Sequence, residues 1–177
     1  MLYFIAIVAP AHIDGQVMVW KKHMLEHYSC KVALKSPAHI TLVPPFKMSV
    51  EKEKELGEHL QTFSSKEKSF TIRIKDFDRF APKVIFLHTE PDEPLLLLKQ
   101  RLEEYLLQFK NFPFKKEERP FHPHITIANR DLRKSDFHKA WTYFEKQQFE
   151  SSFAANSISL LKHNNTNWEI ASNFPLQ

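Results

Sequence analysis

The spacing of hydrophobic and polar residues along the chain predicts strands and helices that recur in the same order. Two short runs rich in β-branched and aromatic residues, 3–8 and 84–88, predict β-strands. Each run is followed by a segment in which apolar residues recur every three or four positions, 14–28 and 93–109. That spacing is typical of an amphipathic helix. Both halves of the chain therefore begin with a strand and a helix.

The second part of each half repeats as well. In each half, a short apolar run follows the first helix, and a second helical segment follows that run. A strand comes next, and it is predicted to form a hairpin with the following apolar run. The second helices are predicted over 49–63 and 135–147, and the hairpins join 70–77 to the run at 84–88 and 156–163 to a run at 168–171. Corresponding positions in the two halves lie about 85 residues apart. The chain thus contains an internal repeat.

This repeat predicts the fold class. We expect an α+β protein in which residues 1–177 form a single bilobal domain, without a linker between independent parts. The two lobes should be related by a pseudo-two-fold axis. Each lobe should be an antiparallel sheet with its helices on the outside, and the cleft between the lobes should bring equivalent elements face to face.

Composition excludes several classes of nucleotide-binding protein. The chain has 177 residues, of which 42% are hydrophobic, and its sixteen Phe residues can fill a core. There are only two glycines, Gly15 and Gly57, and they lie far apart. A P-loop and a Rossmann fingerprint both need clustered glycines so that the backbone can approach phosphate. We therefore expect neither, and no cofactor.

Charge and cysteine content indicate the setting of the protein. Its single cysteine, Cys30, cannot form an internal disulfide or a cysteine zinc site, which fits a reducing compartment. The apolar run at residues 2–10 has no preceding Lys or Arg, so a first strand is favoured over a signal peptide. We expect a cytoplasmic monomer without a membrane segment. The net charge of +4 weakly indicates an anionic partner, such as RNA or a phosphate ester.

One tripeptide occurs at equivalent places in both halves of the chain. His-Ile-Thr stands at residues 39–41 and again at 124–126, each time inside a predicted strand. Side chains at positions i and i+2 of a strand point to the same face. His39 and Thr41 should therefore share a face, as should His124 and Thr126. A single histidine on a strand is more often structural, but packing alone would favour Val or Ile at both places.

Two histidines and two hydroxyls around one point suit phosphodiester cleavage. A neutral imidazole can accept a proton from an attacking water or hydroxyl, and a protonated one can give a proton to the leaving oxygen. The hydroxyls of Thr41 and Thr126 can donate to the nonbridging oxygens as their charge grows. This chemistry requires no metal.

The paired motifs resemble the two signatures of the 2H (two-histidine) phosphoesterase superfamily. Within it, the chain is most similar to bacterial RNA 2′,3′-cyclic phosphodiesterases, also called 2′-5′ RNA ligases, over nearly its whole length. The second motif is the fuller match, because residues 121–130 (FHPHITIANR) resemble the family's PHxTxAR stretch. The family's arginine then falls at Arg130, after one extra residue, Asn129.

The resemblance implies hydrolysis of a 2′,3′-cyclic phosphate, on an RNA end or a nucleotide, to a 2′-phosphate without a metal. It implies that His39 is the general acid at the leaving O3′ and that His124 is the base that activates water. The near-symmetry of the motifs leaves the reverse assignment open. Other activities of the same fold also stay open: 2′-5′ RNA ligation, cleavage of 2′-5′ oligonucleotides or small cyclic nucleotides, or RNA binding without catalysis.

Several other residues have two interpretations. Arg130 can hold a phosphate or lie free on the surface, and Phe80 and Phe121 can stack on a base or belong to the core. His122 and His124 form a His-x-His pair, but no Asp, Glu or Cys stands close by in the sequence, so we expect no metal there. Three lysines can steer RNA, although a solvated face is the simpler interpretation: Lys83, Lys115 and Lys116.

Overall fold

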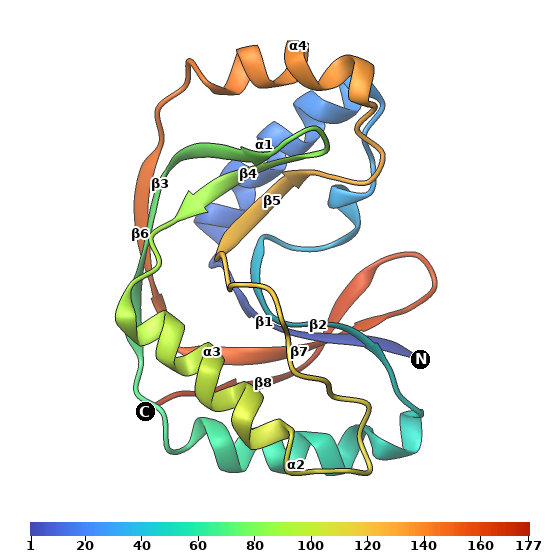
Figure 1. The fold of residues 1–177 in the computed structure, drawn as a ribbon, viewed down its shortest axis with the longest axis vertical. Coiled ribbons are helices and arrows are strands. Elements are labelled where there is room, and N and C mark those ends of the chain that lie inside the picture. Colours follow the sequence, from blue (N-terminus) through green and yellow to red (C-terminus); the bar gives the residue numbers. More distant parts are fainter.

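A single curled antiparallel sheet forms the centre of the protein in a computed structural model that describes residues 1–177 (Figure 1). Its eight strands lie in the order β6-β3-β4-β5-β2-β1-β7-β8. The strands are β1 (Leu2–Val8), β2 (His39–Lys47), β3 (Phe70–Phe80), β4 (Val84–Thr89), β5 (His124–Ala128), β6 (Glu150–Ala155), β7 (Ser157–His163) and β8 (Trp168–Pro175). The helices are α1 (Ala11–Tyr28), α2 (Glu53–Ser64), α3 (Glu93–Leu106) and α4 (Lys134–Phe144), with 3₁₀ turns at Ala33–Lys35 and Val50–Lys52.

The order of the strands confirms the predicted pseudo-symmetric α+β fold. One half of the sheet reads β5-β4-β3-β6 outward from the centre, and the other reads β2-β1-β7-β8. Both predicted hairpins, β3–β4 and β7–β8, are present. The halves in space differ from the repeats in sequence, however. Strand β3 of the first repeat pairs with β4 of the second, and β7 of the second pairs with β1 of the first, so each half needs both repeats.

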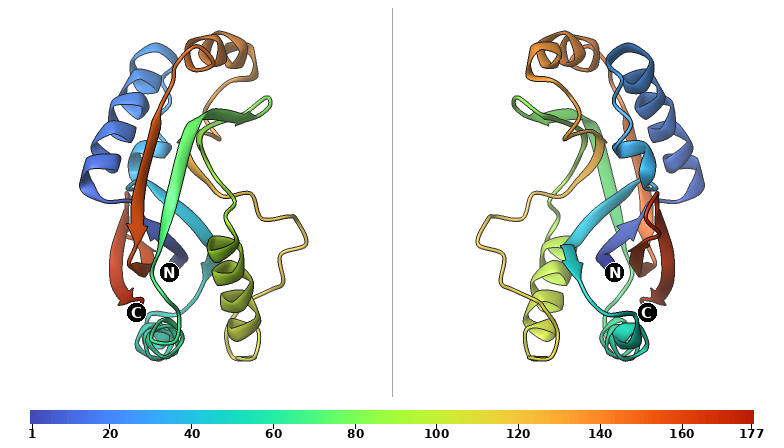
Figure 2. Two further views of the ribbon diagram at one scale, coloured as in Figure 1. Left: turned by 90° about the vertical axis from the view of Figure 1, so that its left-hand side faces the viewer. Right: turned by 90° about the vertical axis from the view of Figure 1, so that its right-hand side faces the viewer.

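The helices cover the sheet in the way that their apolar spacing predicts. Helix α1 buries Ile13, Val17 and Met24, and α3 buries a row of leucines, all within one core cluster of 40 residues. Helix α1 contacts β5 and α4, α2 contacts β7 and β8, and α3 contacts β2 and β3 (Figures 1 and 2). No helix has the length and apolar character needed to cross a membrane.

Several boundaries differ from those expected, and one strand was not predicted. Helix α1 begins at Ala11 rather than at residue 14, directly after Pro10, which is extended and precedes the first turn. Helix α3 ends at Leu106 rather than at residue 109. Strand β6 was not expected, because Phe153 is its only large apolar residue, and its place is set by pairing with β3.

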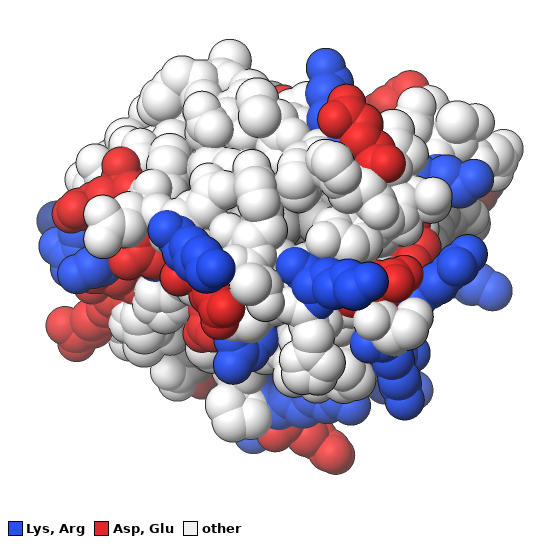
Figure 3. Space-filling view, turned by 90° about the horizontal axis from the view of Figure 1, so that it is seen from above, with Lys and Arg blue, Asp and Glu red and all other residues white.

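Two surface features bear on partners. The connection from α3 to β5, residues 107–123, stands off the body of the molecule (Figure 2). At the end that carries α4, Lys and Arg lie among Asp, Glu and uncharged residues (Figure 3). That end of the molecule therefore offers no continuous basic surface for RNA.

Candidate active site

The two His-Ile-Thr segments meet at the centre of the sheet. Strands β2 and β5 pair through Ile40 and Ile125, both of which are completely buried. Residues on either side of a paired position point to the opposite face of the sheet. This single pairing therefore turns His39, Thr41 and their counterparts in β5 away from the core, toward one another.

Two adjoining cavities contain all seven residues that the sequence singled out. The larger, of about 400 Å³, is lined by His124, Phe80 and Phe121, among others. The smaller, of about 210 Å³, is lined by His39, Thr126 and Arg130. Thr41 lines both, so the cavities meet at this hydroxyl. The structure thus brings the candidate residues together, while their catalytic roles remain a proposal.

Both motif histidines have the same ring orientation. The Nδ1 of His39 lies 2.7 Å from the carbonyl oxygen of Pro37, and the Nδ1 of His124 lies 2.7 Å from that of His122. A carbonyl can only accept, so each Nδ1 carries the proton. In the neutral ring, Nε2 then has a free lone pair. Each imidazole is held as a base that becomes an acid once it is protonated.

Aromatic rings support both imidazoles. Phe4 of β1 packs on His39 with ring centroids 4.7 Å apart, and Phe86 of β4 packs on His124 at 4.9 Å. These phenylalanines occupy equivalent strands, and neither was among the residues predicted for the site. Phe80 packs on both Phe86 and His124, at 4.5 and 5.3 Å. The environment of His124 is therefore the more aromatic of the two.

Burial makes both histidines weak proton acceptors in the free protein. The pKa of His39 is lowered to about 4, first by burial and then by the nearby charges of Lys21 and His124. The pKa of His124 is also lowered, first by burial and then by His122. Both rings are neutral at pH 7. An anion bound between them would favour protonation, so a substrate phosphate can supply the condition for acid catalysis.

Helix α1 holds the segment that precedes His39. The buried Lys21 donates from Nζ to the carbonyl oxygen of Ser36 at 2.9 Å, and burial lowers the pKa of this amine to about 8. Asp14 accepts the backbone N–H of Ala38 at 2.6 Å. Sequence reasoning missed both residues. A lysine on the apolar face of a predicted helix was the available signal, because buried lysines need a partner.

Among the charged residues that the sequence indicated, only Arg130 lines either cavity. Arg130 is exposed and lines the smaller cavity, and Lys99 and Arg119 line the larger one. Neither cavity is lined by Lys83, Lys115 or Lys116, all of which are exposed. These three therefore have no place in the site itself.

Comparison with known proteins identifies the family. Residues 9–167 match the model of the 2′-5′ RNA ligase superfamily, and the chain belongs to that superfamily. It is 28% identical to a protein of Geobacillus sp. (strain WCH70) that is provisionally named a phosphoesterase, over 98% of this chain and 95% of that one. This likeness extends over almost the full length of both chains.

Solved structures share the fold. E. coli LigT complexed with 3′-AMP is 24% identical, with a TM-score of 0.72 over 99% of this chain and 97% of that one. TT0787 of Thermus thermophilus is 17% identical, with a TM-score of 0.71 over 99% of this chain and 98% of that one. The curled sheet with its paired central strands is thus an arrangement that other proteins also adopt.

Proposed function

We propose that this protein hydrolyses 2′,3′-cyclic phosphates, on a nucleotide or an RNA end, to 2′-phosphates without using a metal. One observation carries the proposal. The symmetry-related imidazoles of His39 and His124 lie on one face of the sheet, and a carbonyl fixes Nδ1 in each so that Nε2 is free. Membership of the 2′-5′ RNA ligase superfamily supports a phosphodiester substrate.

The reaction needs one proton removed and one proton delivered. The base accepts a proton from water through Nε2 as the water oxygen bonds to phosphorus. The bond from phosphorus to O3′ breaks, and the acid gives its proton to O3′. The product is a 2′-phosphate with a free 3′-hydroxyl. Thr41 and Thr126 both line the smaller cavity, and their hydroxyls can donate to the nonbridging oxygens.

The proposed roles are His39 as acid and His124 as base, following the family likeness. The low pKa of His39 means that the free enzyme rarely holds the required proton at pH 7. The phosphate anion must therefore raise this pKa on binding. Arg130 lines the cavity of His39, so its charge is available to hold the same phosphate.

The larger cavity is proposed to hold the nucleoside. Its volume of about 400 Å³ falls in the range of small-molecule sites. Phe80, Phe121 and His122 line it and present ring faces on which a base can stack. LigT, which has the same fold, is described in complex with 3′-AMP, and this supports a nucleotide in the present cavity.

A substrate panel tests the proposal. We expect turnover of 2′,3′-cyclic mononucleotides or of oligomers that end in a cyclic phosphate, with a 2′-phosphate identified by ³¹P NMR. The His39→Ala and His124→Ala variants should lose this activity. His138→Ala, an exposed histidine on α4, is the matched control and should keep it. Turnover only of 2′-5′ oligoadenylate, or joining of RNA ends, would assign the site to another reaction of the superfamily.

A further inference from the structure

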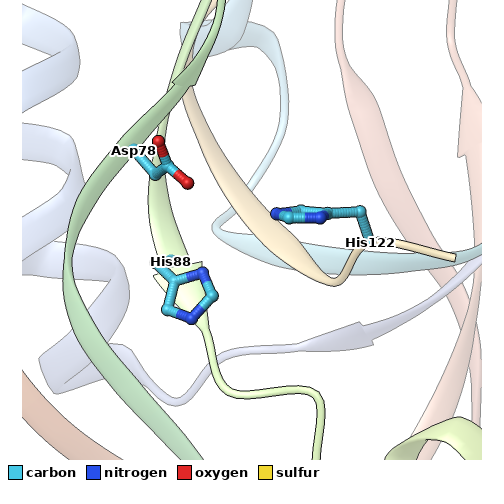
Figure 4. Close-up of side chains that lie close together, drawn as sticks. All are labelled: Asp78, His88 and His122. Atoms are coloured by element: carbon cyan, nitrogen blue, oxygen red, sulfur yellow. The ribbon is translucent and has the colours of Figure 1, made fainter.

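A second cluster of chemically competent side chains lies beside the larger cavity. The ligand-type atoms of Asp78, His88 and His122 all lie within 4.8 Å of one another. Figure 4 shows the carboxylate of Asp78 and the ring of His88 on adjacent strands, with the ring of His122 directed toward them from the other side. The three residues come from different segments of the chain, so no local metal-binding motif contains them.

The sheet register explains how these residues come together. Asp78 of β3 pairs with Phe86 of β4, and His88 stands two residues beyond Phe86, on the same face. His88 in turn pairs with His124 of β5, and His122 lies just before that strand. The cluster is therefore built on two rigid strands and on the entry to a third.

The polar atoms of the cluster are not satisfied by one another. No hydrogen bond or ion pair joins Asp78, His88 or His122. The Nδ1 of His88 is buried and has no hydrogen-bond partner in the protein. A buried nitrogen of this kind calls for a water or an ion, because its desolvation is otherwise uncompensated. Asp78 uses Oδ1 to accept the N–H of Arg79 at 2.8 Å, which leaves its other oxygen free.

We propose that Asp78, His88 and His122 form a binding site for a divalent transition-metal ion, with Zn²⁺ as the best fit. Two imidazoles and one carboxylate match the His₂-carboxylate sets that hold Zn²⁺ with an open position. Mg²⁺ and Ca²⁺ prefer all-oxygen sites, so the two nitrogens disfavour them. Ligand atoms on a tetrahedral Zn²⁺ lie roughly 3.4 Å apart for bonds of about 2.0–2.1 Å, so the side chains need to close by up to about 1.4 Å. Asp78 and His122 are exposed, which leaves solvent-side room for this movement.

The site is distinct from the proposed proton-transfer pair but touches it. His122 lines the larger cavity, and its carbonyl oxygen accepts the Nδ1–H of His124 at 2.7 Å. A metal would bind the ring of His122, whereas His124 hydrogen-bonds only to the backbone carbonyl of this residue. The proposed reaction assigns both proton transfers to His39 and His124. The ion therefore has only a structural role at the wall of the cavity.

Metal titration of the purified, chelator-stripped protein tests the proposal. Competition between the protein and a chromogenic chelator should give one Zn²⁺ per chain, and Co²⁺ should show the visible absorption of a four- or five-coordinate site. Asp78→Asn and His88→Ala should each weaken Zn²⁺ on the order of 100-fold, since each removes one of three ligands. His138→Ala is the matched control and should bind as the wild type does.

Two results would overturn the assignment. Equal Zn²⁺ affinity in wild type and Asp78→Asn would place the ion elsewhere, and this exposed substitution should fold even if His88→Ala does not. The second result is that His124→Ala loses Zn²⁺ binding while His88→Ala binds as the wild type does. It would indicate that the ion is bound by His122 and His124 instead. Neither result bears on the hydrolysis proposed above, which is measured separately in the presence of EDTA.

Discussion

Ile40 of β2 lies opposite Ile125 of β5, and this is the backbone pairing through which the two halves of the sheet are joined. Its position determines which face every neighbouring side chain takes. Because both isoleucines point into the core, the histidine and threonine on either side of each point out. A shift of one residue at this junction would turn the imidazoles into the core and the isoleucines toward the site. The same contact thus serves the fold and the candidate site.

Binding of a tetrahedral anion should be coupled to proton uptake. The pKa of His39 is about 4 in the free protein and should rise beside an anion, so the complex takes up protons at pH 7. We expect sulfate to bind more tightly as the pH falls from 8 to 5.5. Calorimetry in buffers of different ionisation enthalpy measures the uptake. The His39→Ala variant should show less of it, and equal uptake in both proteins would contradict the proposed role of His39.

The unusual pKa of His39 also predicts how stability depends on pH. Its folded value of about 4 lies below the unfolded value of 6.5, so the unfolded chain binds a proton first as the pH falls. The contribution is fully present above pH 6.5 and is lost progressively as the pH approaches 4, by up to about 3 kcal/mol. Urea unfolding at several pH values measures it. His39→Asn should lose less stability over that interval than wild type; an identical loss would refute the attribution.

A substrate with sulfur in place of the bridging O3′ should reveal which histidine is the acid. A thiolate leaves without a proton far more readily than an alkoxide, so loss of the acid matters less. With His39 as the acid, His39→Ala should recover most of its activity on this substrate, while His124→Ala should not. Single-turnover rates for the oxygen and sulfur substrates give the ratio. Recovery in His124→Ala alone would exchange the two roles.

The main residues of this site could be predicted from the sequence because the same motif occurs at equivalent positions of the two repeats. These residues are His39, Thr41, His124 and Thr126. Side chains two positions apart on a strand share a face, and this holds whatever the fold. Sequence patterns also predicted both hairpins and all four helices, because their apolar spacing is regular.

The remaining features depend on contacts between distant segments. Strand β6 forms because the edge of β3 is available for pairing. Strands β3 and β7 each pair with a strand of the other sequence repeat, and no local pattern predicts this. The Asp78, His88 and His122 cluster arises from register across three strands. The contacts of Phe4 and Phe86 with the motif histidines cannot be inferred from hydrophobicity.

Removal of metal should leave hydrolysis intact. In the proposed reaction both proton transfers are made by imidazoles, and the Asp78, His88 and His122 cluster serves structure only. Initial rates on a 2′,3′-cyclic nucleotide should be unchanged within twofold after dialysis against EDTA. A matched sample with Zn²⁺ restored controls for loss of protein. Loss of activity that Zn²⁺ restores would place the metal in the chemistry.

The threonine hydroxyls should contribute less than the imidazoles. Thr41→Val and Thr126→Val keep the shape of the side chain and remove the donor, and each should lower kcat by about 10-fold to 10³-fold. Because the donors act on charge that develops in the transition state, KM should change little. Steady-state kinetics separates the two constants. A raised KM with an unchanged kcat would make the hydroxyls substrate-binding groups only.

The most direct test of the two-histidine account is a double-mutant cycle on 2′,3′-cyclic phosphate hydrolysis. His39→Ala and His124→Ala should each lower the rate on the order of 10² to 10⁴, the usual effect of a positioned acid or base. The double variant should lose less than the product of the two, because the groups act as one unit. Circular dichroism confirms folding. A near wild-type rate in either single variant, on every cyclic phosphate that the wild type cleaves, would contradict the mechanism.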